Sequence, residues 1–121
     1  MSEQKYLLEI TGSPLLAPEL RKMETSLSDS FKIRSETPIE DPARLGFSLK
    51  KAVAIVAIVS GLLTSADLTE RLVETIEHSG SQTTVMQAPS GGKIIIELPK
   101  DKKISAAQRS DLLDFFDRMM R

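Results

Sequence analysis

The chain has 121 residues, of which 40% are hydrophobic and 27% are charged, a composition typical of one globular domain. Its formal net charge of -1 leaves no excess of Lys and Arg to neutralise a phosphate backbone, which disfavours nucleic acid as a partner. Because the chain has no cysteine, disulfides, thiolate metal sites and cysteine nucleophiles are excluded.

The chain up to residue 46 predicts a strand, a helix, a second strand and a loop. Apolar and polar side chains alternate over residues 5–11, which is typical of a strand with one buried face. A helix begins near Pro18, because proline is tolerated in the first turn of a helix but not further in. Alternation returns over residues 31–36, where charged outward positions indicate a strand near a sheet edge. Residues 37–46 contain two prolines and no period, so we expect a loop.

The most apolar segment covers residues 52–63 and consists mainly of Ala, Val, Ile and Leu. A membrane span needs about 20 apolar residues. This run is shorter, and it follows Lys50 and Lys51 directly. We therefore disfavour a membrane span and interpret the run as a buried core helix that kinks or breaks at Ser60 and Gly61. A peripheral contact of the two lysines with a membrane surface is the alternative.

A further helix and a hairpin follow the apolar segment. The helix begins at Ser65 and ends at Gly80, a residue suited to the left-handed conformation that closes many helices. Residues 82–88 and 93–98 predict two paired strands, since the glycines between them supply the reversal of the chain. A lysine follows these glycines, but the spacing of a phosphate-binding loop is absent.

The last helix combines a clear start with a broad apolar surface. Ser105 and Gln108 fit the capping box that opens a helix, which we expect to run to about residue 120. Its apolar residues cover more than one stripe, so part of this surface faces either a partner protein or the sheet and apolar helix of the same chain. The candidate interaction surface comprises Leu112, Phe115, Phe116, Met119 and Met120.

These elements, in the order β-α-β-α-α-β-β-α, predict an α+β fold. We expect a single compact domain over residues 1–121. Two separated pairs of strands favour a four-stranded, mainly antiparallel sheet with the helices packed on one face. A ferredoxin-like split βαβ arrangement is our hypothesis for the strand topology.

Few residues carry catalytic or metal-binding chemistry. His78 is the only histidine and falls in the last turn of a helix, where we expect a helix-end role rather than acid–base work. Asp111, Asp114 and Asp117 recur every three residues and allow a hard-cation site, but Arg118 provides an ion-pair partner, so we favour a solvated helix face. We expect no catalytic residue, no metal and no cofactor.

The order of several short sequence features resembles the effector-associated constant component family of bacterial conflict systems. These features are the strand from Tyr6 to Ile10, Glu19-Leu20, Leu45-Gly46, Ser60-Gly61, Gly91-Gly92-Lys93-Ile94 and the terminal amphipathic helix. The resemblance implies a small accessory protein that joins effector components to NTPase or protease components in bacterial antiviral defence. It implies no catalytic residues.

We therefore expect a non-enzymatic adaptor or scaffold subunit that binds a protein partner, such as an effector protease or an NTPase, and that self-associates through the terminal helix. The polar N-terminus and the absence of cysteine predict a cytoplasmic location. The alternative is a small-ligand-binding regulatory domain, because compact sheets with helices on one face often bind metabolites. A hydrolase of unrecognised type would require a polar pocket near His78.

Overall fold

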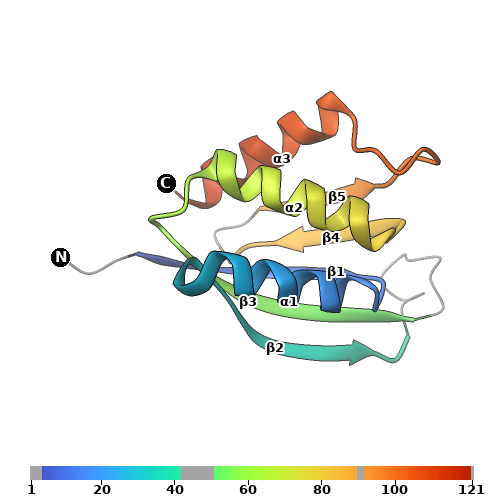
Figure 1. Ribbon diagram of the computed structural model, residues 1–121, viewed down its shortest axis with the longest axis horizontal. Helices are drawn as coiled ribbons and strands as arrows, with labels where there is room; N and C mark the ends of the chain where they lie inside the picture. The colour runs from blue at the N-terminus through green and yellow to red at the C-terminus, as the bar shows by residue number, and fades with distance from the viewer. Residues whose placement is uncertain (1–3, 42–50, 90–91, 121) are drawn as a thin grey trace.

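A five-stranded antiparallel sheet and three α-helices form the fold in the computed structural model, which describes residues 4–41, 51–89 and 92–120 (Figure 1). The elements along the chain are β1 (Lys5–Gly12), α1 (Leu16–Leu27), a short 3₁₀ turn (Ser28–Ser30), β2 (Phe31–Ile39), β3 (Ala52–Ser60), α2 (Ser65–Ser79), β4 (Thr83–Gln87), β5 (Lys93–Glu97) and α3 (Ala106–Met119).

The strands are arranged in the order β2-β3-β1-β4-β5, and each neighbouring pair is antiparallel. All three helices lie on the same side of this sheet, with α2 between α1 and α3 (Figure 1). The α+β class and the antiparallel sheet are therefore confirmed. The predicted number of four strands is wrong, because the described residues form five.

The additional strand is β3, which occupies Ala52–Ser60, where we predicted a helix over residues 52–63. Five of its nine residues are Val or Ile, whose branched side chains favour extended backbone. β3 pairs with both β1 and β2, and the helices cover only one of its faces. Both faces of β3 carry Ala, Val or Ile, so its sequence is a continuous apolar run, and periodicity alone does not separate such a run from a buried helix.

Several predicted boundaries also shift. The predicted loop over residues 37–46 begins later, because Thr37–Ile39 belong to β2 and pair with β3. Residues 42–46 lie outside the described residues. α2 begins at Ser65, as predicted, and the side chain of Thr64 caps it by accepting a hydrogen bond from the Asp67 backbone N–H at 3.1 Å. Gly80 closes this helix in the left-handed conformation, with φ of 71°, as predicted.

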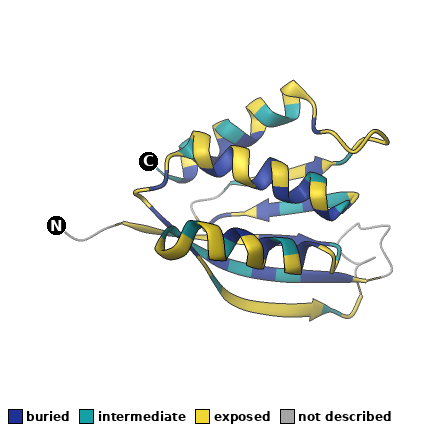
Figure 2. Ribbon diagram, in the orientation of Figure 1, coloured by how far each residue is buried: buried dark blue, intermediate teal, exposed yellow. Residues whose placement is uncertain are grey.

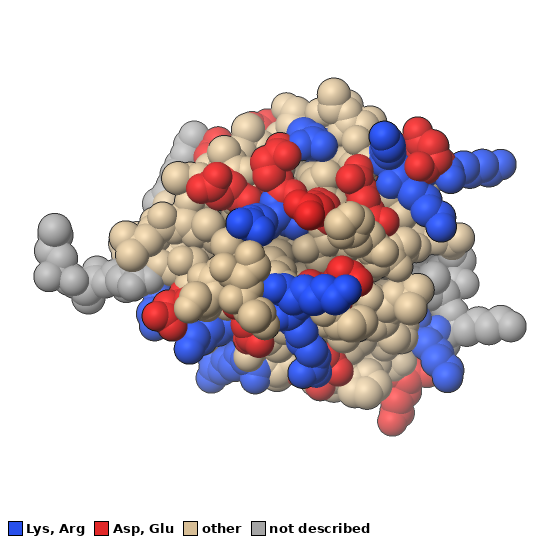
Figure 3. Space-filling view, in the orientation of Figure 1, with Lys and Arg blue, Asp and Glu red and all other residues tan. Residues whose placement is uncertain are grey.

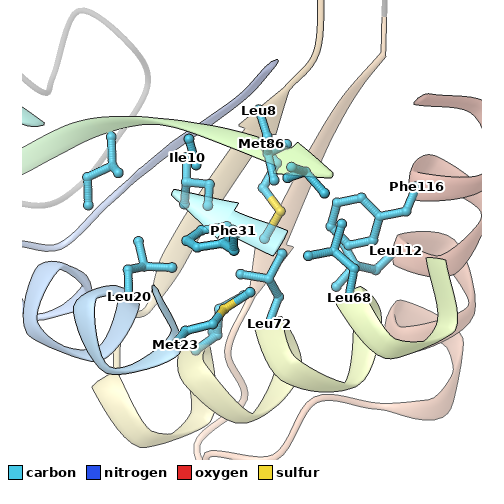
Figure 4. Packing of buried hydrophobic residues seen from close by; sticks show 14 of the residues in the cluster. Leu8, Ile10, Leu20, Met23, Phe31, Leu68, Leu72, Met86, Leu112 and Phe116 are labelled. Atoms are coloured by element: carbon cyan, nitrogen blue, oxygen red, sulfur yellow. The ribbon is translucent and has the colours of Figure 1, made fainter. Parts of the chain in front are cut away.

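The hydrophobic core fills the space between the sheet and the helices. Figure 2 shows buried residues along the sides of the helices and strands that face each other, with exposed residues on the outer sides of the helices. Each large side chain removed from water here contributes about 1.5–3 kcal/mol to folding. The close view in Figure 4 labels ten of them: Leu8, Ile10, Leu20, Met23, Phe31, Leu68, Leu72, Met86, Leu112 and Phe116.

Candidate interaction site

The candidate interaction surface on α3 lies largely inside the protein. Leu112 and Phe116 are 0% exposed, Phe115 and Met119 are buried, and Met120 is half-buried. The two phenylalanine rings contact each other edge to face with centroids 5.4 Å apart. Of the two alternatives for this surface, the structure therefore places most of its side chains against the chain's own sheet and helices.

His78 is exposed near the end of α2, beside a small cleft of about 200 Å³ between α1 and α2. Ser26 and Glu74 also line this cleft, but the Ser26 hydroxyl accepts a hydrogen bond from Arg71 at 3.1 Å. Within the described parts of the chain, no serine or carboxylate is hydrogen-bonded to the imidazole. This arrangement lacks the nucleophile–base contact of a serine hydrolase.

The three aspartates of α3 do not converge on one point. Asp117 accepts a hydrogen bond from the Ser65 hydroxyl on α2, whereas Asp111 and Asp114 line a cleft on the other side, between α3 and β5. The described residues contain no group of three or more potential metal ligands. The geometry therefore gives these side chains separate positions on a solvated helix.

The outer surface of the helices carries charges of both signs. Figure 3 shows Lys and Arg interspersed with Asp and Glu across this face. A second hydrogen bond between α2 and α3 runs from Arg109 to Glu70, and it raises the pKa of the arginine above its ordinary value. Mixed, exposed charges of this kind are typical of a solvated surface.

The opposite face of the sheet is apolar, and no described helix covers it. The strand registers place Leu7 opposite Ile58, and Val85 opposite Ile95, on this face. Leu7 is 38% exposed and Ile95 is 53% exposed, and the Ala, Val and Ile residues beside them on this face are partly exposed. We call this surface the uncovered sheet face; its apolar members are Leu7, Ala54, Val56, Ile58, Val85 and Ile95.

The two outer strands, β2 and β5, expose backbone N–H and C=O groups at the edges of the sheet. For β5, the hydrogen bonds at the two ends of its pairing with β4 determine which residues have outward-pointing groups. The Ala88 N–H donates to Gly92 O at 3.0 Å, and the Leu98 N–H donates to Gln82 O at 2.8 Å. Since bonded pairs alternate in an antiparallel ladder, the even-numbered residues of β5 bond to β4. The N–H and C=O groups of Lys93, Ile95 and Glu97 therefore point to the free edge.

A cleft of about 660 Å³ runs beside this edge, between β5 and α3. Ile94 and Phe115 line its inner part, while Lys93, Asp114 and Arg118 contribute charged groups. At the far end, the Gln108 side-chain amide donates to Glu97 O at 2.8 Å, so α3 occupies one acceptor of the edge. The cleft thus leaves most of the β5 edge accessible from the helix side.

The sequence patterns predicted the hairpin and the last helix, but they did not predict the exposed β5 edge or the uncovered sheet face. The signal for both is the run of three isoleucines between Lys93 and Glu97, which alternate between the covered face and the uncovered face. The exposed position of β5 became visible only with the strand order, which the sequence patterns did not fix.

Comparisons with protein-family models, with curated proteins and with solved structures found no match to this chain. The resemblance to the effector-associated constant component family therefore stays a prediction. Among the described residues, none of the helices combines the length and the apolar character that a membrane crossing requires. Lys50, which we considered for a peripheral membrane contact, lies outside the described residues.

Proposed function

We propose that this protein is a non-enzymatic adaptor or scaffold subunit that acts in the cytoplasm and binds a partner protein through the uncovered sheet face. The apolar character of that face carries the proposal. Large apolar patches on small proteins mark sites where another macromolecule docks, because exposed apolar surface is unfavourable in water. The partner that fits is a protein with an apolar patch of its own.

Charged residues at the margin of the face refine this partner. The registers align Lys32 with Ile58 and Leu7, and they align Lys93 with Gln87 and Glu9. Lys32 and Lys93 therefore flank the apolar centre at β2 and at β5, and the exposed Glu9 and Glu97 lie on the same face. A partner with charges of both signs around its apolar patch is complementary to this arrangement.

The biological setting follows from the sequence resemblance. It favours a bacterial defence system, with an effector protease or an NTPase as the partner. For strands β1 to β4 we propose a ferredoxin-like topology, which is supported by the element order β-α-β-β-α-β and the strand order β2-β3-β1-β4. In this interpretation β5 and α3 are additions to one side of that core.

Photo-crosslinking in the native cell tests the proposal. A crosslinking amino acid in place of Leu7 is expected to capture one defined protein, whereas the same group at the exposed Glu74 of α2 is expected not to capture it. Ile58→Glu, which places a charge next to Leu7 on the same face, should abolish the crosslink while circular dichroism remains unchanged. Equal capture from both positions would count against docking on this face.

A small-ligand-binding regulatory domain is the second candidate, and the β5–α3 cleft favours it. Its volume of about 660 Å³ lies within the range of about 300–1,000 Å³ that is typical of ligand sites. A metabolite that binds the folded protein must raise its melting temperature. Arg118→Ala should remove that rise for an anionic ligand, and no rise across a broad metabolite panel would exclude this candidate.

A further inference from the structure

We propose that two copies of this chain associate through the free edge of β5, so that their sheets join into one continuous antiparallel sheet. The contact uses the strand edge, whereas the proposed adaptor function uses the face of the sheet. Each proposal can therefore fail without the other. The two edges of the sheet differ in how well they are protected against pairing with another strand.

The β2 edge is protected against pairing with another strand. The Gly61 N–H donates to Gln4 O at 2.7 Å and extends the β1–β3 ladder, so the even-numbered residues of β3 bond to β2. Ile33 and Pro38 consequently fall at outward-facing positions of β2. Glu24 of α1 accepts the Ile33 N–H at 2.6 Å, and proline has no N–H to offer.

A bulge adds a third protection to β2. The register with β3 shifts between Ile33 and Ser35, which leaves Arg34 as an extra residue in the strand. A bulge of this kind twists an edge strand and interrupts its ladder of hydrogen-bonding groups. Proline, a bulge and charged side chains are the features by which edge strands avoid pairing with other chains.

The β5 edge has neither a proline nor a bulge, and its two charged residues, Lys93 and Glu97, stand at its ends. Its register with β4 is regular from Lys93 to Glu97. At its centre, Ile95 is 53% exposed and directs both its N–H and its C=O outwards. The contact from Gln108 involves only Glu97 O, and a carbonyl oxygen has a second lone pair that can accept another hydrogen bond.

The charges on β5 identify the strand that fits this edge as a second copy of β5. When two copies run antiparallel about a twofold axis at Ile95, Lys93 of each copy lies opposite Glu97 of the other. The two isoleucines lie opposite each other at the centre. Opposite charges at facing positions stabilise a strand pair, and like charges destabilise it. In a parallel arrangement in register, Lys93 would instead lie beside Lys93.

The hydrogen-bonding positions agree with this alignment. Lys93, Ile95 and Glu97 are the residues whose backbone groups point outwards, and in the proposed register they face only one another. The closed twofold arrangement satisfies both edges at once, and it leaves the protected β2 strands at the two ends of the joined sheet. The uncovered faces of the two copies then lie side by side.

Charge reversal on the full chain tests this register by sedimentation equilibrium. The unaltered protein should show a monomer–dimer equilibrium. Lys93→Glu and Glu97→Lys each place like charges opposite each other twice per dimer, so each should raise the dimer dissociation constant about tenfold. An equimolar mixture of these two variants should associate again, because every facing pair in the mixed dimer is then Glu with Lys.

Lys100→Glu is the matched control, since it makes the same change in charge in the exposed loop after β5 and should leave the dissociation constant unaltered. Melting temperatures of all variants check that the monomers remain folded. The proposal is overturned if the unaltered protein stays monomeric at high micromolar concentration. It is equally overturned if the mixture of the two variants associates no better than either variant alone.

Discussion

The two edge strands belong to one sheet but receive different support from the helices beside them. α1 binds the β2 edge at two places: Glu24 accepts the Ile33 N–H, and Arg21 forms an ion pair of 2.7 Å with Glu36. On the opposite side, the hydrogen bond described between α3 and the β5 edge is the one from Gln108 to Glu97 O. Whether an edge strand is open to pairing therefore depends on how many of its outward N–H and C=O groups a neighbouring helix satisfies, as well as on its own side chains.

The two edges also differ in whether their backbone groups contribute to folding or remain available for binding. The contacts on β2 satisfy backbone groups within the chain, so their loss should lower the free energy of unfolding. The contacts still open on β5 contribute nothing to the isolated chain and become available only in a complex. Substitutions on the β2 side should therefore act mainly on folding, and substitutions of exposed β5 residues mainly on association.

The largest effect is expected where α3 loses a fully buried ring from the core. Phe116→Ala removes a ring that is 0% exposed and should lower the free energy of unfolding by about 3–5 kcal/mol. Urea unfolding followed by circular dichroism measures this loss. Leu15→Ala, at a position that is 58% exposed, is the control and should change stability by less than about 0.5 kcal/mol. Similar values for both variants would contradict the packing of α3.

The next effect tests the contact between α3 and the start of β5. A Cβ atom on Gly92 would lie 2.8 Å from the Phe115 ring, so Gly92→Ala should force the ring to move and cost about 1–3 kcal/mol. Phe115→Leu should restore part of that loss by making room. In a double-mutant cycle the two changes should therefore cost less together than the sum of their separate effects. Simple additivity would show that the two sites are not in contact.

On the opposite edge, Glu24→Gln replaces a charged acceptor of the Ile33 N–H by a neutral one. We expect a loss of about 1–2 kcal/mol in the free energy of unfolding, together with faster amide hydrogen exchange at Ile33. Glu19→Gln, which alters an exposed ion pair with Lys22 on the same helix, should cost about 0.5 kcal/mol or less. A larger loss for Glu19→Gln would refute the role assigned to Glu24.

The smallest effect on stability is expected at the β5 edge, where one side-chain hydrogen bond connects α3 to the backbone of the strand. Gln108→Ala removes the hydrogen bond to Glu97 O and should lower the free energy of unfolding by about 0.5–1 kcal/mol. The same change removes a competing donor from Glu97 O, so the hydrogen bond of this oxygen in the dimer should strengthen and the dimer dissociation constant should fall about threefold. Sedimentation equilibrium of the variant beside the unaltered protein measures this. Weaker association of the variant would show that Gln108 supports pairing instead of limiting it.

Most individual elements could be predicted from local patterns. The alternation in β1, the cap and the closing glycine of α2, and the hairpin of β4 and β5 are all signals carried by neighbouring residues. The error over residues 52–63 arose because alanine favours helices while valine and isoleucine favour strands. β3 shows no alternation of polar and apolar residues because its uncovered side also carries Ala, Val and Ile, so the choice depended on partners that lie far away in the sequence.

The candidate site depended even more on distant partners. Whether Ile95 lies at an edge is decided by the position of β4 next to β1, and no residue near Ile95 encodes that arrangement. The apolar residues of α3 likewise gave equal support to a docking surface and to a core, until the positions of β5 and α2 were known. Sequence patterns identified which side chains are apolar, but the tertiary structure determines which of them remain exposed.

The central position of β3 has a consequence for unfolding. Its first eight residues are Ala, Val and Ile without a single charge or proline, a composition that forms intermolecular β-structure readily when it is exposed. In the native protein, β1 and β2 occupy both of its edges. Heating releases those edges together, so thermal denaturation should lead to irreversible aggregation, and the apparent melting temperature should depend on the scan rate.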